Sequence, residues 1–452
     1  MEDFKDKNVT IMGLGLHGGG LATAKFFLAE GANITITDLR TKEILKQTIE
    51  QLKGEKINYT LGEHIDSDFT NADIVIKNPG VPKTSKYLKL AKRVESDISI
   101  FLQRVNTPII AITGSKGKSS TVSAIYHVLK KFNPKTRLGG NITVSPLTFI
   151  NDVDETTPVI LELSSWQLAD LNGKGCLKPK IAAVTNIMND HQNAYNSLDE
   201  YAEDKAVIFQ GVTDYAILNY NDKYRDFFKS RLNIKPLYYS NTEEPSHING
   251  IYLDSANQGW SNIEGKRELL LDPQLTLKGE HQRENLLLAA LILSLYGVDK
   301  KSIRTGLQEF KGIAHRMELF HEKNGVKYYN DSAATIPEAA CAAINSFKTP
   351  IHLISGGTDK ALEFSSIKNY FSKPKSIYLL AGTGTDKMME VLNSNNIDYF
   401  GPYKSLEKLI SELKPNIEPG DSVLFSPGAT SFGMFNNEFD RGDQFKAIIS
   451  KI

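Results

Sequence analysis

The sequence predicts an α/β protein of three domains, and three observations lead to this prediction. At 452 residues the chain exceeds the size at which a single hydrophobic core keeps growing. Short β-branched runs alternate with segments of helical periodicity, which is typical of parallel sheets covered by helices. Two of the runs lead directly into glycine-rich turns, near residues 13–20 and 114–119. We expect the domains to span residues 1–104, 105–312 and 313–452.

The first domain opens with a predicted βαβ unit. A strand within 8–16 precedes a glycine turn, a helix at 21–30 and a second strand at 33–37, and Asp38 follows about twenty positions after the turn. This is the layout of a Rossmann-like dinucleotide fold, and Asp38 and Arg40 would lie at a strand's carboxyl end, where ligands bind. The pattern allows NAD, the uridine diphosphate of a nucleotide sugar, or only a tight turn with a capping Asp.

The rest of the first domain continues the alternation of predicted strands and helices. A strand at 73–77 leads into the stiff turn 78–80, whose amides could meet a phosphate. Charged sequence at 86–104 predicts a helix that closes the domain, and the pattern changes from polar helix to buried strand within 103–108.

The second domain begins with a strand, a loop and a helix in the order of a phosphate-binding loop. The apolar run 109–112 precedes GSKGKS at 114–119, and residues with helical spacing follow. Glycines let backbone N–H groups turn toward phosphate oxygens, and the helix N-terminus faces the same anion. Lys118 would lie against the β- and γ-phosphates and Ser119 would complete a Mg²⁺ site. The sequence therefore predicts ATP binding at Gly114, Ser115, Lys116, Gly117, Lys118, Ser119 and Ser120.

Several later residues are candidates for the same site. Glu162 interrupts an apolar strand at 159–163, where a carboxylate is costly to bury unless it binds a metal or caps the strand end. Asn186, Asp190 and His191 follow the strand 181–187, at the edge where ligands bind in parallel sheets. His191 is as consistent with a structural role as with a catalytic one. Judged from its local sequence alone, Lys205 is a solvated residue on a charged helix face. Asn285 lies near the start of a predicted helix within 277–297, within reach of a purine ring.

Composition narrows the class of protein. Lys and Arg together number 53, as do Asp and Glu, which disfavours a nucleic-acid binder. The two cysteines lack metal-binding spacing. The charged N-terminal sequence leaves no room for the apolar core of a signal peptide, and no run is long enough to span a bilayer. We expect a cytoplasmic protein without membrane insertion, and a monomer.

Eight motifs, taken together and in this order, resemble those of the Mur ligase family over essentially the whole chain. They are GSKGKS at 114–119, LELSSWQL with Glu162, the pair Asp190 and His191, Lys205, His281 with Asn285, HR at 315–316, NDS at 330–332 and the terminal SPGATSF. The resemblance implies an ATP-dependent amide ligase of peptidoglycan precursor synthesis. Its glutamate-adding branch fits best, which implies that D-glutamate joins UDP-N-acetylmuramoyl-L-alanine through an acyl phosphate, with release of ADP and phosphate.

The resemblance also implies roles for individual residues. The UDP-substrate would be held by Leu16, Asp38, Arg40, Asn78, Gly80 and Asn141. Two Mg²⁺ ions would be bound by Ser119 and Glu162 and by His191 and a carbamylated Lys205. Asn285 would face adenine, and Arg316 and Asp331 would reach the γ-phosphate and the ribose. Lys118, His191, Lys205 and Arg316 would be the catalytic residues, and Thr335, Lys360 and Ser431 would hold the incoming amino acid.

Two departures from the family pattern leave the amino acid open. Ala333 stands where a lysine is common, and Glu438 occupies the position of a pocket phenylalanine. L-Glutamate or another acceptor, as in other Mur ligases or folylpolyglutamate synthases, therefore remains an alternative. Two further alternatives are a nicotinamide-dependent oxidoreductase, which would leave Glu162 without a role, and a nucleotide-binding module that has lost catalysis.

Overall fold

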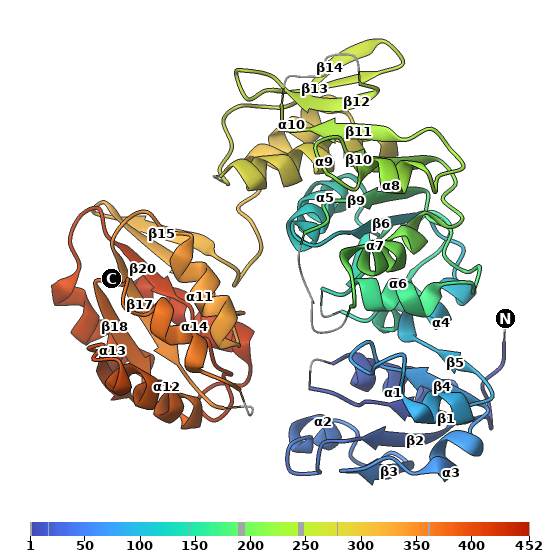
Figure 1. The fold of residues 1–452 in the computed structure, drawn as a ribbon, viewed down its shortest axis with the longest axis horizontal. Helices are drawn as coiled ribbons and strands as arrows, with labels where there is room; N and C mark the ends of the chain where they lie inside the picture. Colours follow the sequence, from blue (N-terminus) through green and yellow to red (C-terminus); the bar gives the residue numbers. More distant parts are fainter. Residues whose placement is uncertain are drawn as a thin grey trace. The chain divides into compact units, whose positions relative to one another are not determined.

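The chain folds around three separate β-sheets, which confirms the prediction of an α/β protein with three domains (Figure 1). The computed structural model describes residues 2–16, 18–142, 144–188, 195–242, 248–277, 279–359 and 362–451. It forms two compact units, Met1–Phe310 and Lys311–Ile452. The first unit contains two of the sheets. The exact domain boundaries predicted at 104 and 312 stay a prediction.

The first sheet is parallel and has the strand order β3-β2-β1-β4-β5, as in a Rossmann-like half. Helix α1 and the strands it connects bury their apolar residues in one core, while a smaller cluster packs beneath α3. The elements are β1 (Asn8–Met12), α1 (Gly19–Ala29), β2 (Asn33–Asp38), α2 (Lys46–Glu50), β3 (Ile57–Leu61), α3 (Asp66–Thr70), β4 (Ile74–Lys77), η1 (Lys86–Leu90), β5 (Val94–Glu95) and α4 (Asp97–Arg104).

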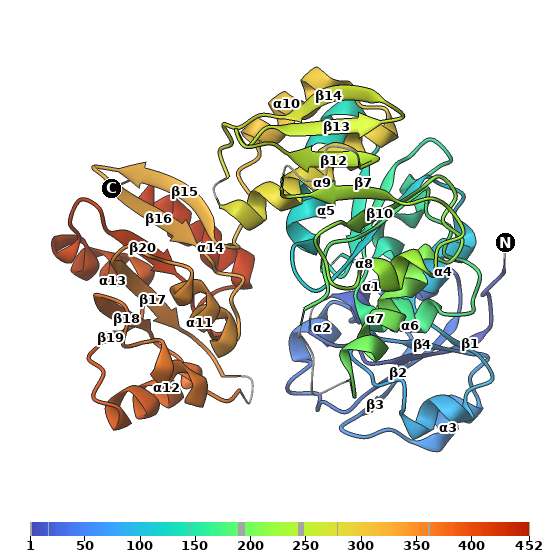
Figure 2. The same ribbon diagram turned by 45° about the horizontal axis from the view of Figure 1, so that its top comes forward.

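The second sheet has nine strands in the order β14-β13-β12-β11-β10-β9-β6-β8-β7 and is parallel from β7 to β12. Strands β12, β13 and β14 lie side by side at one end of this sheet (Figure 2). Helices α5, α9 and α10 cover one face, whereas α6 and α7 pack on the other. The elements are β6 (Ile109–Thr113), α5 (Lys118–Phe132), β7 (Arg137–Gly140), η2 (Pro146–Asp152), β8 (Val159–Glu162), α6 (Ser165–Leu171), β9 (Ile181–Val184), α7 (Leu198–Ala206), η3 (Val207–Phe209), β10 (Tyr215–Asn219), α8 (Arg225–Lys229), β11 (Leu237–Ser240), β12 (Gly250–Leu253), β13 (Gly259–Ile263), β14 (Lys266–Leu271), α9 (Glu280–Tyr296) and α10 (Lys300–Glu309).

The third sheet forms the core of the second unit, with the order β15-β16-β20-β17-β18-β19. Helices α11 and α12 cover one face, and α13 and α14 cover the other, so this unit is doubly wound. The elements are β15 (Glu318–Lys323), β16 (Val326–Asn330), α11 (Pro337–Asn345), β17 (Ile351–Gly356), η4 (Ser365–Asn369), β18 (Ser376–Leu380), α12 (Thr383–Ser394), β19 (Phe400–Tyr403), α13 (Leu406–Leu413), η5 (Lys414–Asn416), β20 (Ser422–Phe425) and α14 (Glu438–Ile449).

One expected element is wrong. The charged segment 86–104, predicted as one helix, contains η1, the short strand β5 and α4. Ser96 starts α4 with a capping box, in which its Oγ accepts from the Ser99 amide and the Ser99 hydroxyl accepts from the Ser96 amide. This local cap ends the extended segment that pairs with β4. Among the described residues, no helix has both the length and the apolar composition needed to cross a bilayer.

Candidate active site

The phosphate loop lies between β6 and α5, and the end of β9 holds its backbone in place. The Ser115 amide donates to the Asn186 carbonyl at 2.8 Å, and the Lys116 amide donates to Asn186 Oδ1 at 3.0 Å. Thr185 Oγ1 in turn donates to the Lys116 carbonyl at 2.6 Å. The position of Asn186 at the sheet edge agrees with the sequence analysis, whereas Thr185 was not singled out, because a threonine after an apolar strand carries no distinctive signal.

Two glycines allow the loop to pass close to its neighbours. Gly114 has φ +138°, and a Cβ there would lie 1.9 Å from Thr185 Oγ1. Gly117 has φ +86°, and a Cβ there would lie 2.2 Å from Asn285 Oδ1. Only glycine meets both the backbone conformation and the space at these positions. The close contacts of the loop with Thr185 and Asn285 therefore require both glycines.

Lys118 and Ser119 form the first turn of α5 at the mouth of this loop. Lys118 Nζ donates to the carbonyls of Gly114 and Ser115 at 2.8 and 2.9 Å, so its ammonium lies across the loop. Lys118, Ser119 and Ser120 are each partly exposed. The loop amides, this ammonium and the positive end of a fifteen-residue helix converge at one point, which is suited to a polyphosphate.

Glu162 ends β8, next to β6, and its side chain is 1% exposed. Its Oε1 accepts from Asn141 Nδ2 at 2.9 Å, but Oε2 has no hydrogen-bond partner within the described part of the chain. A buried carboxylate oxygen without a donor is costly unless a cation binds it. Glu162 and Ser119 thus fit a hard cation such as Mg²⁺, which prefers oxygen ligands.

Lys205 on α7 is buried, with 1% of its surface exposed, so the expectation of a solvated residue from its local sequence is wrong. Its Nζ lies 3.4 Å from Thr113 Oγ1, at the end of β6, and 4.4 Å from the ring centre of Tyr201. The Tyr201 hydroxyl lies 3.3 Å from Ser115 Oγ in the phosphate loop. Tyr201 was missed by the sequence analysis, although its position four residues before Lys205 was a usable signal.

Asn285 lies in the first turns of α9, where its Oδ1 faces Gly117. Near it, Asn219 Nδ2 donates to Glu284 Oε1 at 2.9 Å and to the Thr185 carbonyl at 3.1 Å. Burial raises the pKa of Glu284. The structure therefore brings Asn285 to the phosphate loop, and its contact with adenine stays a prediction.

The predicted UDP-binding residues of the first sheet also gather at one edge. Asp38 Oδ2 accepts from the Gly15 amide at 3.0 Å, and its Oδ1 lies 3.3 Å from Arg40 Nη1. Asn78 packs over the same glycine turn, and its Oδ1 accepts from the Gly80 amide at 3.2 Å. Leu16 lies in this turn and is partly exposed. Asn141 belongs to the second sheet, where it contacts Glu162.

The second unit brings Asp331 and Ser431 to the carboxyl ends of its strands. Asp331 Oδ2 accepts from Ser426 Oγ at 2.7 Å and Oδ1 from the Met317 amide at 3.0 Å, while burial raises the pKa of this carboxyl to about 6. Arg316 is exposed and lowers that pKa electrostatically.

Ser431 is 3% exposed, and its hydroxyl has no hydrogen-bond partner among the residues described here. Thr335 is partly exposed.

Three predicted residues, Asp190, His191 and Lys360, lie outside the described residues. Within the described ranges, no group of three or more His, Cys, Asp or Glu side chains has an arrangement suited to a metal ion. Metal binding by Glu162 stays a prediction, and it would need oxygen ligands of other types, such as Ser119.

These features define a class of protein: an α/β enzyme that binds a nucleotide through a phosphate loop, with a buried carboxylate on the neighbouring strand. Three family models match the chain: a MurD-like N-terminal domain at residues 7–100, the Mur ligase middle domain at 112–293 and the Mur ligase glutamate ligase domain at 315–428. The chain belongs to the Mur ligase family.

Individual relatives and solved structures support the assignment to the Mur ligase family. The chain is 40% identical to UDP-N-acetylmuramoylalanine--D-glutamate ligase of Borreliella afzelii, over 100% of this chain and 99% of that protein. Among solved structures, it resembles the UDP-N-acetylmuramate-alanine ligase MurC of Thermotoga maritima with a TM-score of 0.56 and 18% identity, covering 98% and 99% of the two chains. It also resembles MurF of T. maritima in complex with ADP, with a TM-score of 0.51 and 17% identity, covering 99% and 95%. At these identities the two structures support the fold alone.

The contact between Gly117 and Asn285 generates a prediction. Gly117→Ala places a methyl group 2.2 Å from Asn285 Oδ1, at a position whose φ of +86° disfavours any residue with a Cβ. We therefore expect the loop to shift. A non-hydrolysable ATP analogue should then bind at least about tenfold more weakly, as measured by calorimetry. Gly265→Ala is the matched control, because Gly265 has φ +80° with no atom within 4 Å of the added Cβ. Equal binding by both variants would contradict the assigned contact.

Proposed function

We propose that this protein is an ATP-dependent ligase that joins D-glutamate to UDP-N-acetylmuramoyl-L-alanine and releases ADP and phosphate. The observation that carries the proposal is the buried carboxylate of Glu162, with one oxygen lacking a donor among the described residues, on the strand beside a phosphate loop. Full-length similarity to a D-glutamate ligase supports the choice of substrates. A nicotinamide-dependent oxidoreductase would leave both features without a role.

We infer that Ser119 and Glu162 hold one Mg²⁺ and that His191 and Lys205 hold a second. When bound, these ions neutralise phosphate charge in the transition state. Asn141 orients Glu162 through the 2.9 Å hydrogen bond to Oε1, which leaves Oε2, without a partner among the described residues, for the metal ion.

Residues of this chain would carry the reaction as follows. The loop amides and Lys118 bind the β- and γ-phosphates, and Arg316 offsets the negative charge of the γ-phosphate as the alanyl carboxylate attacks it. The resulting acyl phosphate is attacked by the amino group of glutamate, and phosphate leaves. Asp38, Arg40 and the turn 78–80 hold the UDP moiety, whereas Asp331 reaches the ribose. Exclusion of water protects the acyl phosphate from hydrolysis.

Lys205 would act as a carbamate. A neutral amine attacks CO₂, which forms an N–C bond, and the loss of one amine proton to solvent leaves an anionic carbamate with oxygen ligands. Burial favours the neutral form of lysine that this step needs. Lys205 is 1% exposed, which supplies this environment. We also propose that Thr335, Lys360 and Ser431 bind the amino acid, and that the protein works as a cytoplasmic monomer on small-molecule substrates.

The first test is phosphate release from ATP with UDP-N-acetylmuramoyl-L-alanine and either D- or L-glutamate. We expect release with D-glutamate only, which would mean that Ala333 and Glu438 are compatible with D-glutamate binding. Release with L-glutamate instead would keep the acyl-phosphate chemistry and contradict the proposed acceptor.

Lys205→Ala tests the carbamate. We expect phosphate release to fall by roughly a hundredfold or more, because an anionic ligand is lost, and to recover in part when a short carboxylate such as acetate is added. Phosphate release should be measured with and without the carboxylate, with Lys83→Ala as the exposed lysine control. Full activity in Lys205→Ala would exclude the proposed role.

The raised pKa of Asp331 predicts a pH dependence. Activity that needs the carboxylate falls as the pH is lowered through about 6. In Ser426→Ala the carboxylate loses a hydrogen bond that lowers its pKa, so the acid limb of kcat/KM for ATP should move to higher pH by roughly one unit. Ser346→Ala, which removes an exposed hydroxyl from the same unit, should leave the limb in place. An unmoved limb in Ser426→Ala would refute the assignment to Asp331.

A further inference from the structure

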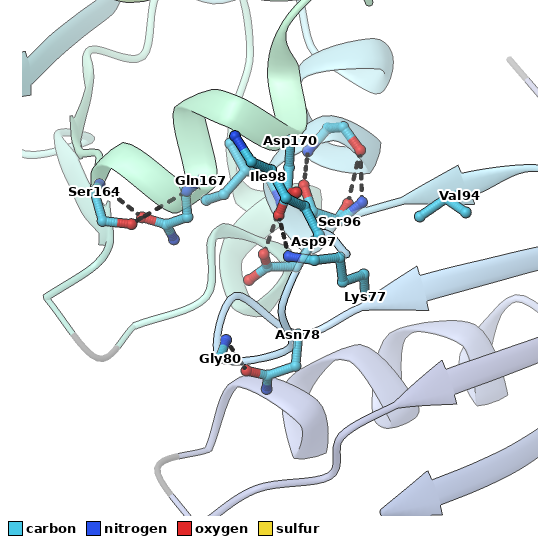
Figure 3. A network of polar contacts seen from close by, with 12 residues as sticks. Lys77, Asn78, Gly80, Val94, Ser96, Asp97, Ile98, Ser164, Gln167 and Asp170 are labelled. Atoms are coloured by element: carbon cyan, nitrogen blue, oxygen red, sulfur yellow. Dashed lines mark hydrogen bonds and ion pairs between the residues drawn. The ribbon is translucent and has the colours of Figure 1, made fainter. Parts of the chain in front are cut away.

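Two ion pairs connect α6 and the residues that follow it, on the second sheet, to strands of the first sheet. Lys77 Nζ lies 2.7 Å from Asp170 Oδ2, and both side chains are largely buried, with 4% and 13% exposed (Figure 3). Lys174, just after α6, donates to the Val94 carbonyl at 2.7 Å and lies 3.0 Å from Glu95 Oε2. We call these two pairs, Lys77 with Asp170 and Glu95 with Lys174, the α6 anchor.

The α6 anchor joins two parts of the candidate active site. Lys77 is the last residue of β4 and directly precedes the turn 78–80, which is proposed to hold the UDP moiety. At the other end, α6 starts three residues after Glu162, and its cap Ser164 exchanges hydrogen bonds with Gln167 at 3.0 and 3.2 Å (Figure 3). A short, capped helix therefore links Asp170 rigidly to Glu162.

The energetics indicate that the Lys77–Asp170 pair contributes alignment more than stability. Burial raises the pKa of Asp170 even though Lys77 and Lys174 act in the opposite direction and Asp204 adds to the increase. The desolvation cost of such a pair commonly cancels its attraction. The apolar core, which runs continuously across both sheets, already holds them together. Because both charges are largely buried, each keeps its partner only while β4 and α6 stay at this spacing, so the 2.7 Å pair constrains their relative position.

We propose that Lys77 and Asp170 are positioning residues for the ligase reaction, which set the turn 78–80 relative to Glu162. This inference rests on the proposed function. The carboxylate of the UDP-substrate must meet the γ-phosphate, and these ligands would be held by the turn 78–80 and by the phosphate loop, respectively. A misplacement of about 1 Å costs roughly a hundredfold in rate.

The test compares Lys77→Met, Asp170→Leu and the double variant that carries both. We expect kcat for phosphate release to fall roughly 10- to 100-fold in all three, while KM for ATP stays within about twofold. The double variant replaces the ion pair by two apolar side chains, so its melting temperature should return close to that of the wild type. Restored kcat in this stable double variant would show a merely structural role and overturn the proposal.

Lys83→Met is the matched control. Lys83 also forms an ion pair across the two sheets, with Asp204 at 3.4 Å, but its side chain is 56% exposed. Exposed ion pairs contribute little to stability, and we expect the loss of this one to leave kcat within about twofold of the wild-type value. A loss as large as that of Lys77→Met would indicate a general charge effect and count against the proposal.

Hydrogen exchange without substrates separates this inference from the proposed function. We expect faster exchange of the amides of Asn78, Gly80 and Val81 in Lys77→Met and in the double variant, and no change in Lys83→Met. If the wild type releases no phosphate with any glutamate, the proposed function fails, and the exchange result decides the inference alone. Unchanged exchange in both Lys77 variants would refute it.

Discussion

The candidate site depends on one constraint, the fixed position of the phosphate loop against the end of β9. Backbone and side-chain hydrogen bonds from Thr185 and Asn186 hold Ser115 and Lys116, so the loop cannot move independently of the sheet. Because β6 lies between β8 and β9, this also fixes the loop relative to Glu162. A preorganised loop needs little rearrangement to bind phosphate, which is how such sites favour a transition state.

Burial of charge is the second feature of the site. Glu162, on β8, and Lys205, on α7, are both about 1% exposed, and each lies next to β6. Burying a charged side chain is costly, and within the described residues the hydrogen bond from Asn141 satisfies only one oxygen of Glu162. A bound cation, as proposed above, would offset this cost at Glu162.

The sequence predicted the features that are encoded locally. The phosphate loop, the strand that ends at Glu162 and the helix that contains Asn285 each follow from a short pattern, since glycine conformation and apolar periodicity act over a few residues. Long-range burial was not predictable. Lys205 reads as a charged helix residue, yet it is buried, and one of its contacts is with Thr113, 92 positions away. Lys77 and Asp170 are 93 positions apart, so no local pattern connects them.

In the second unit, a buried charged side chain also positions candidate site residues. Arg441 is fully buried, and its guanidinium donates to Ser332 Oγ and the Ser332 carbonyl at 3.0 and 2.8 Å and to the Ala429 carbonyl at 3.0 Å. Burial lowers the pKa of Arg441 to about 9, which reflects the desolvation cost. Because Ser332 follows Asp331 and Ala429 lies two residues before Ser431, one side chain fixes the spacing between these two candidate residues. The acceptors are two carbonyls and one hydroxyl from the segments that carry Asp331 and Ser431, so the buried guanidinium holds those segments together through the backbone as well as a side chain.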